Sequence, residues 1–284
     1  MKSGFRVRSI YGAAMTLALC SFAAAQPLGT NYLSEAAKYP DAASKPTPRG
    51  SDGHPDLNGV WHHYLGGLVQ HVDGNFVLGG LVGPRASNSS GKPGAPRDTP
   101  DAKPEYKPEF MAKVKALSTN QVNDDPTLHC KPPGLPRIGP PHQIVQTPKQ
   151  AVFLYSDITG NQWRVVPLDG RAHSKDAEGA YNGDSVAHWE DDTLVVDVAG
   201  LSDETWLGDN GMLHSSQLHI VERLKRVGDT IQYQMTATDP DVLAHPWTYS
   251  RTLTLQFDRL EEAPPCVDTD AGHYVNLEHH DNPR

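Results

Sequence analysis

The sequence predicts a mainly β protein, an antiparallel barrel or a β-sandwich, with a long loop rich in proline and glycine and one short helix. Three observations support this fold class. From residue 142 onward, short apolar runs alternate with hairpin signals. Residues 93–141 contain 11 prolines in 49 residues, too many for continuous sheet or helix. No long stretch repeats its apolar residues with helical spacing.

Nine strands are expected, enough for either a closed barrel or two packed sheets. Their connections are short and carry turn residues such as Gly228-Asp229, which implies antiparallel pairing. The predicted strands span residues 57–64, 142–147, 150–156, 161–167, 184–189, 193–199, 215–226, 230–239 and 247–258.

The predicted domain organisation is simple. Residues 57–284 form a single β domain, preceded by an N-terminal arm at 26–56 that is polar and rich in turn residues. Residues 65–141 form an inserted belt or lid loop, with one short helix at 108–117. Long loops in compact domains are often functional, but a belt tethered by a disulfide explains the segment equally well.

Residues 1–25 read as a secretory signal peptide. Lys2, Arg6 and Arg8 form a basic start, an apolar run follows, and Ala23 to Ala25 supply small residues for cleavage. The run is too short to span a bilayer, so we expect a periplasmic or secreted protein with no stable membrane span. A lipoprotein modified at Cys20 and a retained anchor are the alternatives.

The charge of the mature chain argues against a nucleic-acid partner. The whole chain has a formal net charge of −9, and removal of the signal leaves 22 basic and 34 acidic residues. Phosphate binding requires a basic surface, which this composition does not supply. Two cysteines, Cys130 and Cys266, remain after cleavage, and in an oxidising compartment they are expected to form one disulfide. Two buried free thiols are the alternative.

Alternation along the last three strands turns Glu222 and Arg251 toward the interior. A two-residue turn at Gly228-Asp229 places Glu222 opposite Met235. If the loop at 240–246 lets Asp239 face Trp247, Met235 then faces Arg251. A lone buried charge is prohibitive, so we expect Glu222 and Arg251 to pair, directly or through water.

This pair has two interpretations. A carboxylate in an apolar cavity can serve as a general acid or base, with the guanidinium stabilising an anion. A structural ion pair that fixes the strand register is the alternative. His214 and His173 are candidates for a second acid–base group, and His214 is expected to approach Asp239 or Asp241 at one rim of the barrel. The residues expected to contact substrate are Tyr233, Tyr249, Trp247, Trp61 and Asp239.

No sequence motif supports a cofactor. There is no G-x-G-x-x-G after a strand and no G-x-x-x-x-G-K-[ST], so nicotinamide and nucleotide cofactors are not expected. The 14 histidines include the adjacent pairs His62-His63 and His279-His280. Neighbouring residues on a strand point to opposite faces, so such a pair is poorly placed to bind one ion, and we predict no metal site.

Two resemblances add to these patterns. Gly59-Val60-Trp61 resembles the G-x-W signature of lipocalin-type barrels, in which the Trp plugs one end, and therefore implies a lipocalin-like barrel. Residues 53–270 resemble a family of uncharacterised secreted bacterial proteins, a likeness that implies a single exported domain. The matching stretches are GHPDLNGVW, CKPPGLPR, DGRAH, HWEDDTLVVD, HSSQLHIVER and DPDVLAHPW.

We therefore predict an exported enzyme that acts by acid–base catalysis without an organic cofactor. It would be a lyase, isomerase or hydrolase acting on a small, partly apolar or aromatic molecule. Glu222 is the predicted proton-transfer group and Arg251 the anion stabiliser. The alternatives are a non-catalytic periplasmic ligand carrier and a structural protein of the cell envelope. The sequence predicts a small-molecule partner and gives no signal for an oligomeric state.

Overall fold

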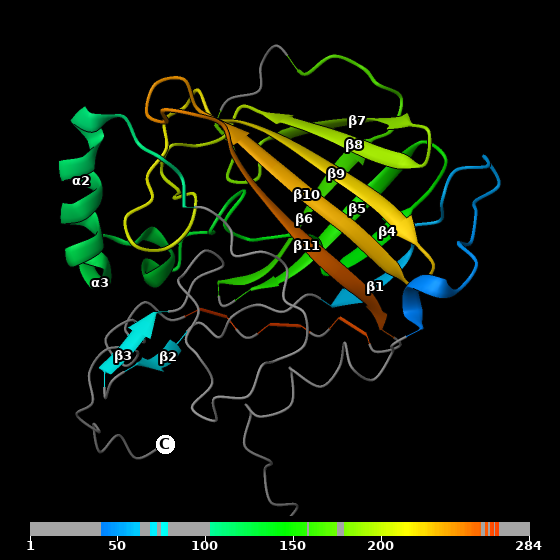
Figure 1. The fold of residues 1–284 in the computed structure, drawn as a ribbon, viewed down its shortest axis with the longest axis horizontal. Helices are drawn as coiled ribbons and strands as arrows, with labels where there is room; N and C mark the ends of the chain where they lie inside the picture. Colours follow the sequence, from blue (N-terminus) through cyan, green and yellow to red (C-terminus); the bar gives the residue numbers. More distant parts are fainter. Residues whose placement is uncertain are drawn as a thin grey trace, which may run out of the picture.

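The computed structural model describes residues 41–62, 69–72, 75–78, 103–157, 159–174 and 179–256, together with 259–260, 262–263 and 265–266. The predicted signal peptide and the start of the arm lie outside the described residues. Nine antiparallel strands form one sheet that nearly closes into a barrel, so the prediction of a mainly β, barrel-like fold is confirmed (Figure 1).

The strands of the barrel follow the order β6-β5-β4-β1-β11-β10-β9-β8-β7. In Figure 1, β8 to β11 run across the front of the barrel, with β4, β5 and β6 behind them. The strands are β1 (Gly59–His62), β4 (Gln143–Gln146), β5 (Gln150–Asp157), β6 (Gly160–Pro167), β7 (Asp184–Glu190), β8 (Thr193–Ala199), β9 (His219–Val227), β10 (Thr230–Thr238) and β11 (Trp247–Gln256). All nine predicted strands are present.

Strand β9 begins at His219, four residues later than predicted. The carboxylate of Asp239 explains the delay. It accepts hydrogen bonds from the backbone N–H and the hydroxyl of Ser215, at 2.7 and 2.8 Å. Leu218 N–H closes a turn onto Ser215 O at 3.2 Å. Because Ser215 is bonded in this turn, the chain joins the sheet ladder only after Leu218.

The inserted belt contains three kinds of structure. Two short strands, β2 (Val69–Val72) and β3 (Asn75–Leu78), pair in a separate hairpin. Helix α2 (Pro108–Thr119) agrees with the predicted helix, and its Pro108 stands in the first turn, where a missing N–H costs least. Short turns of helix follow at α3 (Gln121–Asp124) and η3 (Pro126–His129), and η2 (Ala42–Ser44) lies in the arm.

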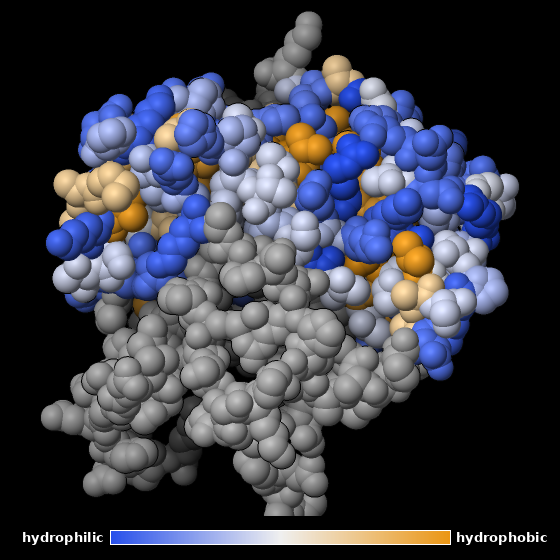
Figure 2. Space-filling view, viewed as in Figure 1, coloured by the Kyte–Doolittle hydropathy of each residue, from blue (hydrophilic) through white to orange (hydrophobic). Residues whose placement is uncertain are grey.

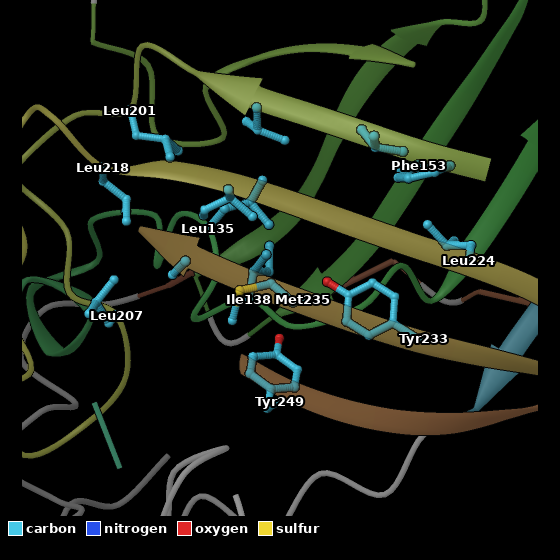
Figure 3. Close-up of a cluster of buried hydrophobic side chains, with 14 of the residues drawn as sticks. Leu135, Ile138, Phe153, Leu201, Leu207, Leu218, Leu224, Tyr233, Met235 and Tyr249 are labelled. Carbon is cyan, nitrogen blue, oxygen red and sulfur yellow. The ribbon is translucent and has the colours of Figure 1, made fainter. Parts of the chain in front are cut away.

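The barrel interior is filled by alternate side chains of the strands. Fully buried residues include Phe153 and Tyr155 on β5, Leu224 on β9 and Met235 on β10. Figure 3 shows Tyr233 and Tyr249 on the same side of β10 and β11, beside Met235. The apolar interior sets the environment of every polar group that the strands turn inward.

The two ends of the sheet meet through side chains. Among the described residues, no backbone ladder joins β6 with β7. Instead, Arg164 on β6 donates to the hydroxyl of Ser185 on β7 at 3.0 Å, and Asn182 donates to Gln162 at 3.3 Å. The polar interior therefore helps to close the barrel.

Strand β10 pairs with β9 in the predicted register but with β11 in a different one. Val227 pairs with Thr230, and Glu222 lies opposite Met235. The prediction for β11 is wrong by two residues, because Ala237, not Asp239, faces Trp247. Asp239 is instead committed to the loop, where its carboxylate also accepts from Asp241 N–H at 3.1 Å and Val242 N–H at 3.3 Å.

The described part of the N-terminal arm is tied to the barrel. Ala42 O accepts from Asp229 N–H at 2.8 Å, and Lys45 pairs with the Asp229 carboxylate at 2.6 Å. Farther along, Arg49 forms a double hydrogen bond with Asp192 at 2.7 and 2.8 Å. Residues 41–56 thus run against the turns at one end of the barrel.

Trp61 is buried at the start of the barrel. Its Nε1 donates to Leu57 O at 2.9 Å, and the guanidinium of Arg226 lies 5.1 Å from its ring centroid. A Cβ on Gly59, which has φ +144°, would lie 2.4 Å from Leu255 Cδ1. The G-x-W pattern therefore reflects close packing, which requires glycine at its first position and a large aromatic residue at its third.

Cys130 and Cys266 form a disulfide, with a Cα–Cα distance of 5.6 Å and a sequence separation of 136. The bond fixes the end of the described chain to the segment after η3. It thereby closes a loop that contains the entire sheet from β4 to β11.

Replacing both cysteines by serine tests this constraint. In the chain-entropy model, a loop of this length contributes about 5 kcal/mol at most, because the bond restricts the unfolded chain. We expect the urea midpoint of Cys130→Ser/Cys266→Ser to fall well below that of the oxidised protein. Reductant should lower the midpoint of the wild type and leave that of the double variant unchanged. Equal midpoints for the oxidised protein and the variant would contradict a stabilising bond.

Candidate functional site

The inward carboxylate of Glu222 is fully buried, with an exposed fraction of 0%. It lies on β9 and forms an ion pair with Arg164 of β6. Its second oxygen accepts a hydrogen bond from the Tyr233 hydroxyl of β10 at 2.8 Å. Burial, and next the charge of Glu222, raise the pKa of Tyr233 well above its usual value, so the phenol keeps the proton that it donates.

Arg164 completes this interior cluster. Besides the contact with Glu222, its guanidinium donates to the Tyr155 hydroxyl at 2.8 Å and to Ser185 Oγ at 3.0 Å. The ring centroid of Phe153 lies 5.0 Å from its Cζ. Burial alone would lower the pKa of Arg164, but the charges and hydrogen bonds of Glu222 and Tyr155 together outweigh burial and raise the pKa. The cluster is therefore a charged pair with donors and acceptors matched.

Arg251 does not form the expected pair with Glu222. It lies opposite Tyr233 on β11, is half-buried, and donates to Ser250 O at 2.7 Å. Its Cζ lies 4.8 Å from the ring centroid of Tyr249. The prediction found the correct face of the strand for Arg251 but the wrong cation for Glu222, because β6 also turns a guanidinium inward.

The outer face of β7, β8 and β9 holds a second polar cluster, which we call the outer cluster. It consists of His173, Asp184, Asp197 and His219. His173 Nδ1 lies 2.9 Å from Asp184 Oδ2, and its Nε2 lies 2.7 Å from Asp197 Oδ1. The same Asp197 oxygen lies 2.9 Å from His219 Nε2. Two histidines and two carboxylates thus form one chain of hydrogen bonds.

The outer cluster remains accessible to solvent. The side chains of His173 and His219 are 27% and 43% exposed. Strand alternation explains this, since the neighbours of Asp184, Asp197 and His219 along each strand point into the core. The cluster can therefore meet a dissolved molecule, whereas the interior cluster around Glu222 is sealed.

The partners of His173 determine its charge. A carboxylate only accepts hydrogen bonds, so contact with two ionised carboxylates requires both ring nitrogens to donate. Partial burial alone would lower the pKa of His173, but the hydrogen bonds and charges of Asp197 and Asp184 outweigh it and raise the pKa. Burial likewise would raise the pKa of Asp197, but hydrogen bonds from His173 and His219 lower it. The two carboxylates therefore favour the imidazolium form of His173.

A turn after β6 places His173. Gly170 has φ +65° and its N–H donates to Ala187 O at 2.9 Å, which fixes the loop against β7. Asp169 and Arg171 flank it as an exposed ion pair with a 2.6 Å contact. One residue after His173, Ser174 N–H donates to Asp184 Oδ2 at 2.9 Å. The loop backbone and the side chain of His173 are thus held by one carboxylate.

His214 lies in a different environment from the predicted His–Asp dyad. The ring is buried, with Nε2 2.7 Å from Thr205 Oγ1 and Nδ1 2.9 Å from Ser215 O. Burial lowers the pKa of His214. Asp239 holds Ser215 rather than the His214 ring. His214 and Asp239 therefore support the loop before β9 and lie apart from the outer cluster.

The aromatic residues predicted to contact substrate are buried. Trp247 and Tyr249 pack with ring centroids 5.5 Å apart, and those of Tyr249 and Tyr233 are 6.1 Å apart. Trp61 belongs to the same hydrophobic core. These four side chains fill the interior, and their predicted role in binding stays a prediction.

Sequence reasoning missed Arg164, Asp184, Asp197 and His219. Three positions of the outer cluster lie in the sequence stretches that resemble secreted bacterial proteins. DGRAH ends on His173, HWEDDTLVVD ends on Asp197, and HSSQLHIVER contains His219. The three stretches meet on one face of the barrel, which only the strand pairing reveals.

Apolar side chains also gather on the outer face of β4, β5 and β6. Trp163 is 66% exposed, and Val165 and Val145 are exposed as well. Val152 lies between Val145 and Val165 in the strand pairing. In the view of Figure 2, hydrophilic residues cover most of the described surface and apolar residues form small groups. A monomer commonly carries an apolar patch of a few hundred Å².

The described residues contain no group of three or more His, Cys, Asp or Glu side chains arranged to hold a metal ion. None of the helices in the described part of the chain is long and apolar enough to cross a membrane. No family model matches the chain, and no curated protein matches its sequence. The resemblance to secreted bacterial proteins therefore stays a prediction.

The interior ion pair predicts a difference between two arginines. Arg164→Met leaves Glu222 buried without its cation and should cost about 3–5 kcal/mol of unfolding free energy. Arg251→Met, on a half-buried side chain, should cost much less. The double variant Arg164→Met/Glu222→Leu should recover part of the loss, because it removes both charges. Urea unfolding measures all three, and equal losses for the two single variants would contradict the assignment of Arg164.

Proposed function

We propose that this protein is an exported enzyme that acts on a small molecule by acid–base chemistry without an organic cofactor, and that the outer cluster is its site. The observation that carries the proposal is the position of His173 between two carboxylates, on a face that solvent reaches. The sealed pair of Glu222 and Arg164 is better suited to a structural role, because each of its charges is already matched.

The two histidines have complementary roles in this proposal. His173, as an imidazolium, supplies positive charge and a proton. When His219 is neutral, its Nε2 carries the hydrogen that Asp197 accepts, so Nδ1 presents a lone pair for a proton from substrate. Asp197 joins the two rings, and Asp184 positions His173. An acid and a base beside one carboxylate suit proton abstraction or hydrolysis.

Export is part of the proposal. The predicted signal peptide at 1–25 lies outside the described residues. The disulfide between Cys130 and Cys266 supports an oxidising compartment such as the periplasm or the cell exterior. The acidic composition of the chain suits an aqueous environment, in which a small substrate would be dissolved.

Turnover of a defined panel tests the proposal. Aryl esters, aryl glycosides and aromatic hydroxy acids are incubated with the oxidised protein, and products are followed by absorbance and mass spectrometry. We expect His173→Asn and Asp197→Asn to lower turnover by about 10²-fold or more, as for loss of a general acid or base. His188→Asn is the matched control, because His188 lies on the same face and its ring contacts Glu190 at 3.3 Å rather than the outer cluster. This variant should keep full activity.

The pH dependence gives a second test. Because the pKa of His173 is raised, activity that needs its proton should persist above the ordinary His pKa of about 6.5 and fall as pH rises through the higher value. Asp197→Asn removes one of the two carboxylates and should move that fall to lower pH. Titration of the His173 ring by NMR checks the same shift without substrate. A pKa at or below the ordinary value, or full turnover in His173→Asn, would contradict the proposal.

A further inference from the structure

A third charged cluster lies away from both sites, between the disulfide-bearing segment and the loop that joins β8 to β9. The guanidinium of Arg137 donates to both oxygens of Asp125, at 2.6 and 2.7 Å. It also donates to Asp209 Oδ1 at 2.7 Å. Two carboxylates thus share one cation, with almost no exposure to water.

The two carboxylates are unequally bonded. Asp125 accepts two further hydrogen bonds, from Thr127 N–H at 3.0 Å and from the Gln121 amide at 2.9 Å. Asp209 has the single bond from Arg137, and its Oδ2 is buried without a hydrogen-bond partner among the described residues. Four donors suit a charged acceptor, and one donor does not. The geometry therefore assigns the ionised form to Asp125.

The cluster has one cation and two carboxyl groups, so it is neutral only if one carboxyl group carries a proton. Arg137 stays charged, so with both carboxylates ionised the cluster would hold one uncompensated negative charge in a nearly dry environment. We propose that Asp209 is a proton-binding latch. When it is protonated, it holds the β8–β9 loop against the disulfide-bearing segment, and when it is ionised, its repulsion from Asp125 loosens that contact.

The surroundings of Asp209 offer no second cation in the described part of the chain. Arg137 and Asp125 are the charged groups that act on it. Asn210, its neighbour, donates its N–H to the neutral side chain of Gln121 at 3.1 Å. Helix α2 packs against the adjacent Gly211 with Val114, Leu117 and Ser118, which do not titrate. Burial, against the opposing charge of Arg137, raises the pKa of Asp209.

The sign of the pH effect follows from this raised value. The folded protein retains the proton to higher pH than the unfolded chain does. The stabilisation from Asp209 is therefore complete below the ordinary Asp pKa of about 3.9 and is lost as pH rises through the folded-state value. The latch strengthens in acid, opposite to the usual behaviour of a salt-bridged carboxylate.

Urea unfolding of the oxidised full chain from about pH 4 to pH 8 tests the latch. Asp209→Asn keeps the shape of the neutral acid and cannot ionise. We expect its urea midpoint to rise relative to the wild type as pH increases, with the two closest at the acid end. Asp203→Asn, at an exposed position in the same loop, is the matched control and should follow the wild type throughout. Parallel pH profiles for wild type and Asp209→Asn would overturn the proposal.

A local measurement keeps the proposal testable even if Asp209→Asn folds poorly. In the wild type, the ¹³C carboxyl signal of Asp209 should titrate above the ordinary Asp pKa. Hydrogen exchange at Leu207 N–H, which donates to Met212 O at 2.6 Å within the loop, should accelerate with pH more steeply than base catalysis alone requires. Titration of Asp209 at or below the ordinary value would overturn the latch.

Discussion

A buried carboxylate on β9 constrains how this barrel can close. Glu222 lies among apolar side chains, where an unpaired charge costs several kcal/mol. Its cation is Arg164, which comes from the far end of the sheet order and also bonds Ser185 on the opposite edge strand. The requirement to neutralise one charge therefore brings β6 to β7 and β9. A flat sheet would leave both charges without partners.

Strand β9 contributes one residue to the interior cluster and one residue to the outer cluster. On β9, Glu222 points inward and His219 points outward, three positions apart. The inward charge is matched by a cation and by the hydrogen bond of a phenol. The outward histidine shares Asp197 with His173, whose charge depends on two half-buried carboxylates. Alternation along a single strand thus places a buried ion pair inside the barrel and a hydrogen-bonded cluster on its outer face.

The sequence was sufficient for the strands, helix α2, the disulfide and the inward position of Glu222. It failed at Arg164 for a physical reason. Along β6, Trp163 and Val165 alternate with Arg164, so alternation alone would turn the apolar pair inward. The structure does the reverse, because pairing with β5 and the charge of Glu222 determine which face is buried. Local hydrophobicity cannot report a partner that lies 58 residues away.

Loop geometry limited the prediction in the same way. The register of β11 depended on how residues 240–246 cross between strands, and Asp239 is used there as an acceptor for loop N–H groups. The outer cluster was hidden because its members come from one loop and three strands. Each was visible as a polar residue, but their contact requires the ladders of β7, β8 and β9.

The two buried arginine clusters differ in the number of carboxylates that the arginine contacts. This number sets the net charge of each cluster. Arg164 meets one carboxylate, so the pair is neutral in total. Arg137 meets two carboxylates, so ionising both leaves a net charge that burial penalises. The first cluster lies where the strands must hold one geometry. The second lies between two loops, where a change of charge can alter a contact without breaking the barrel.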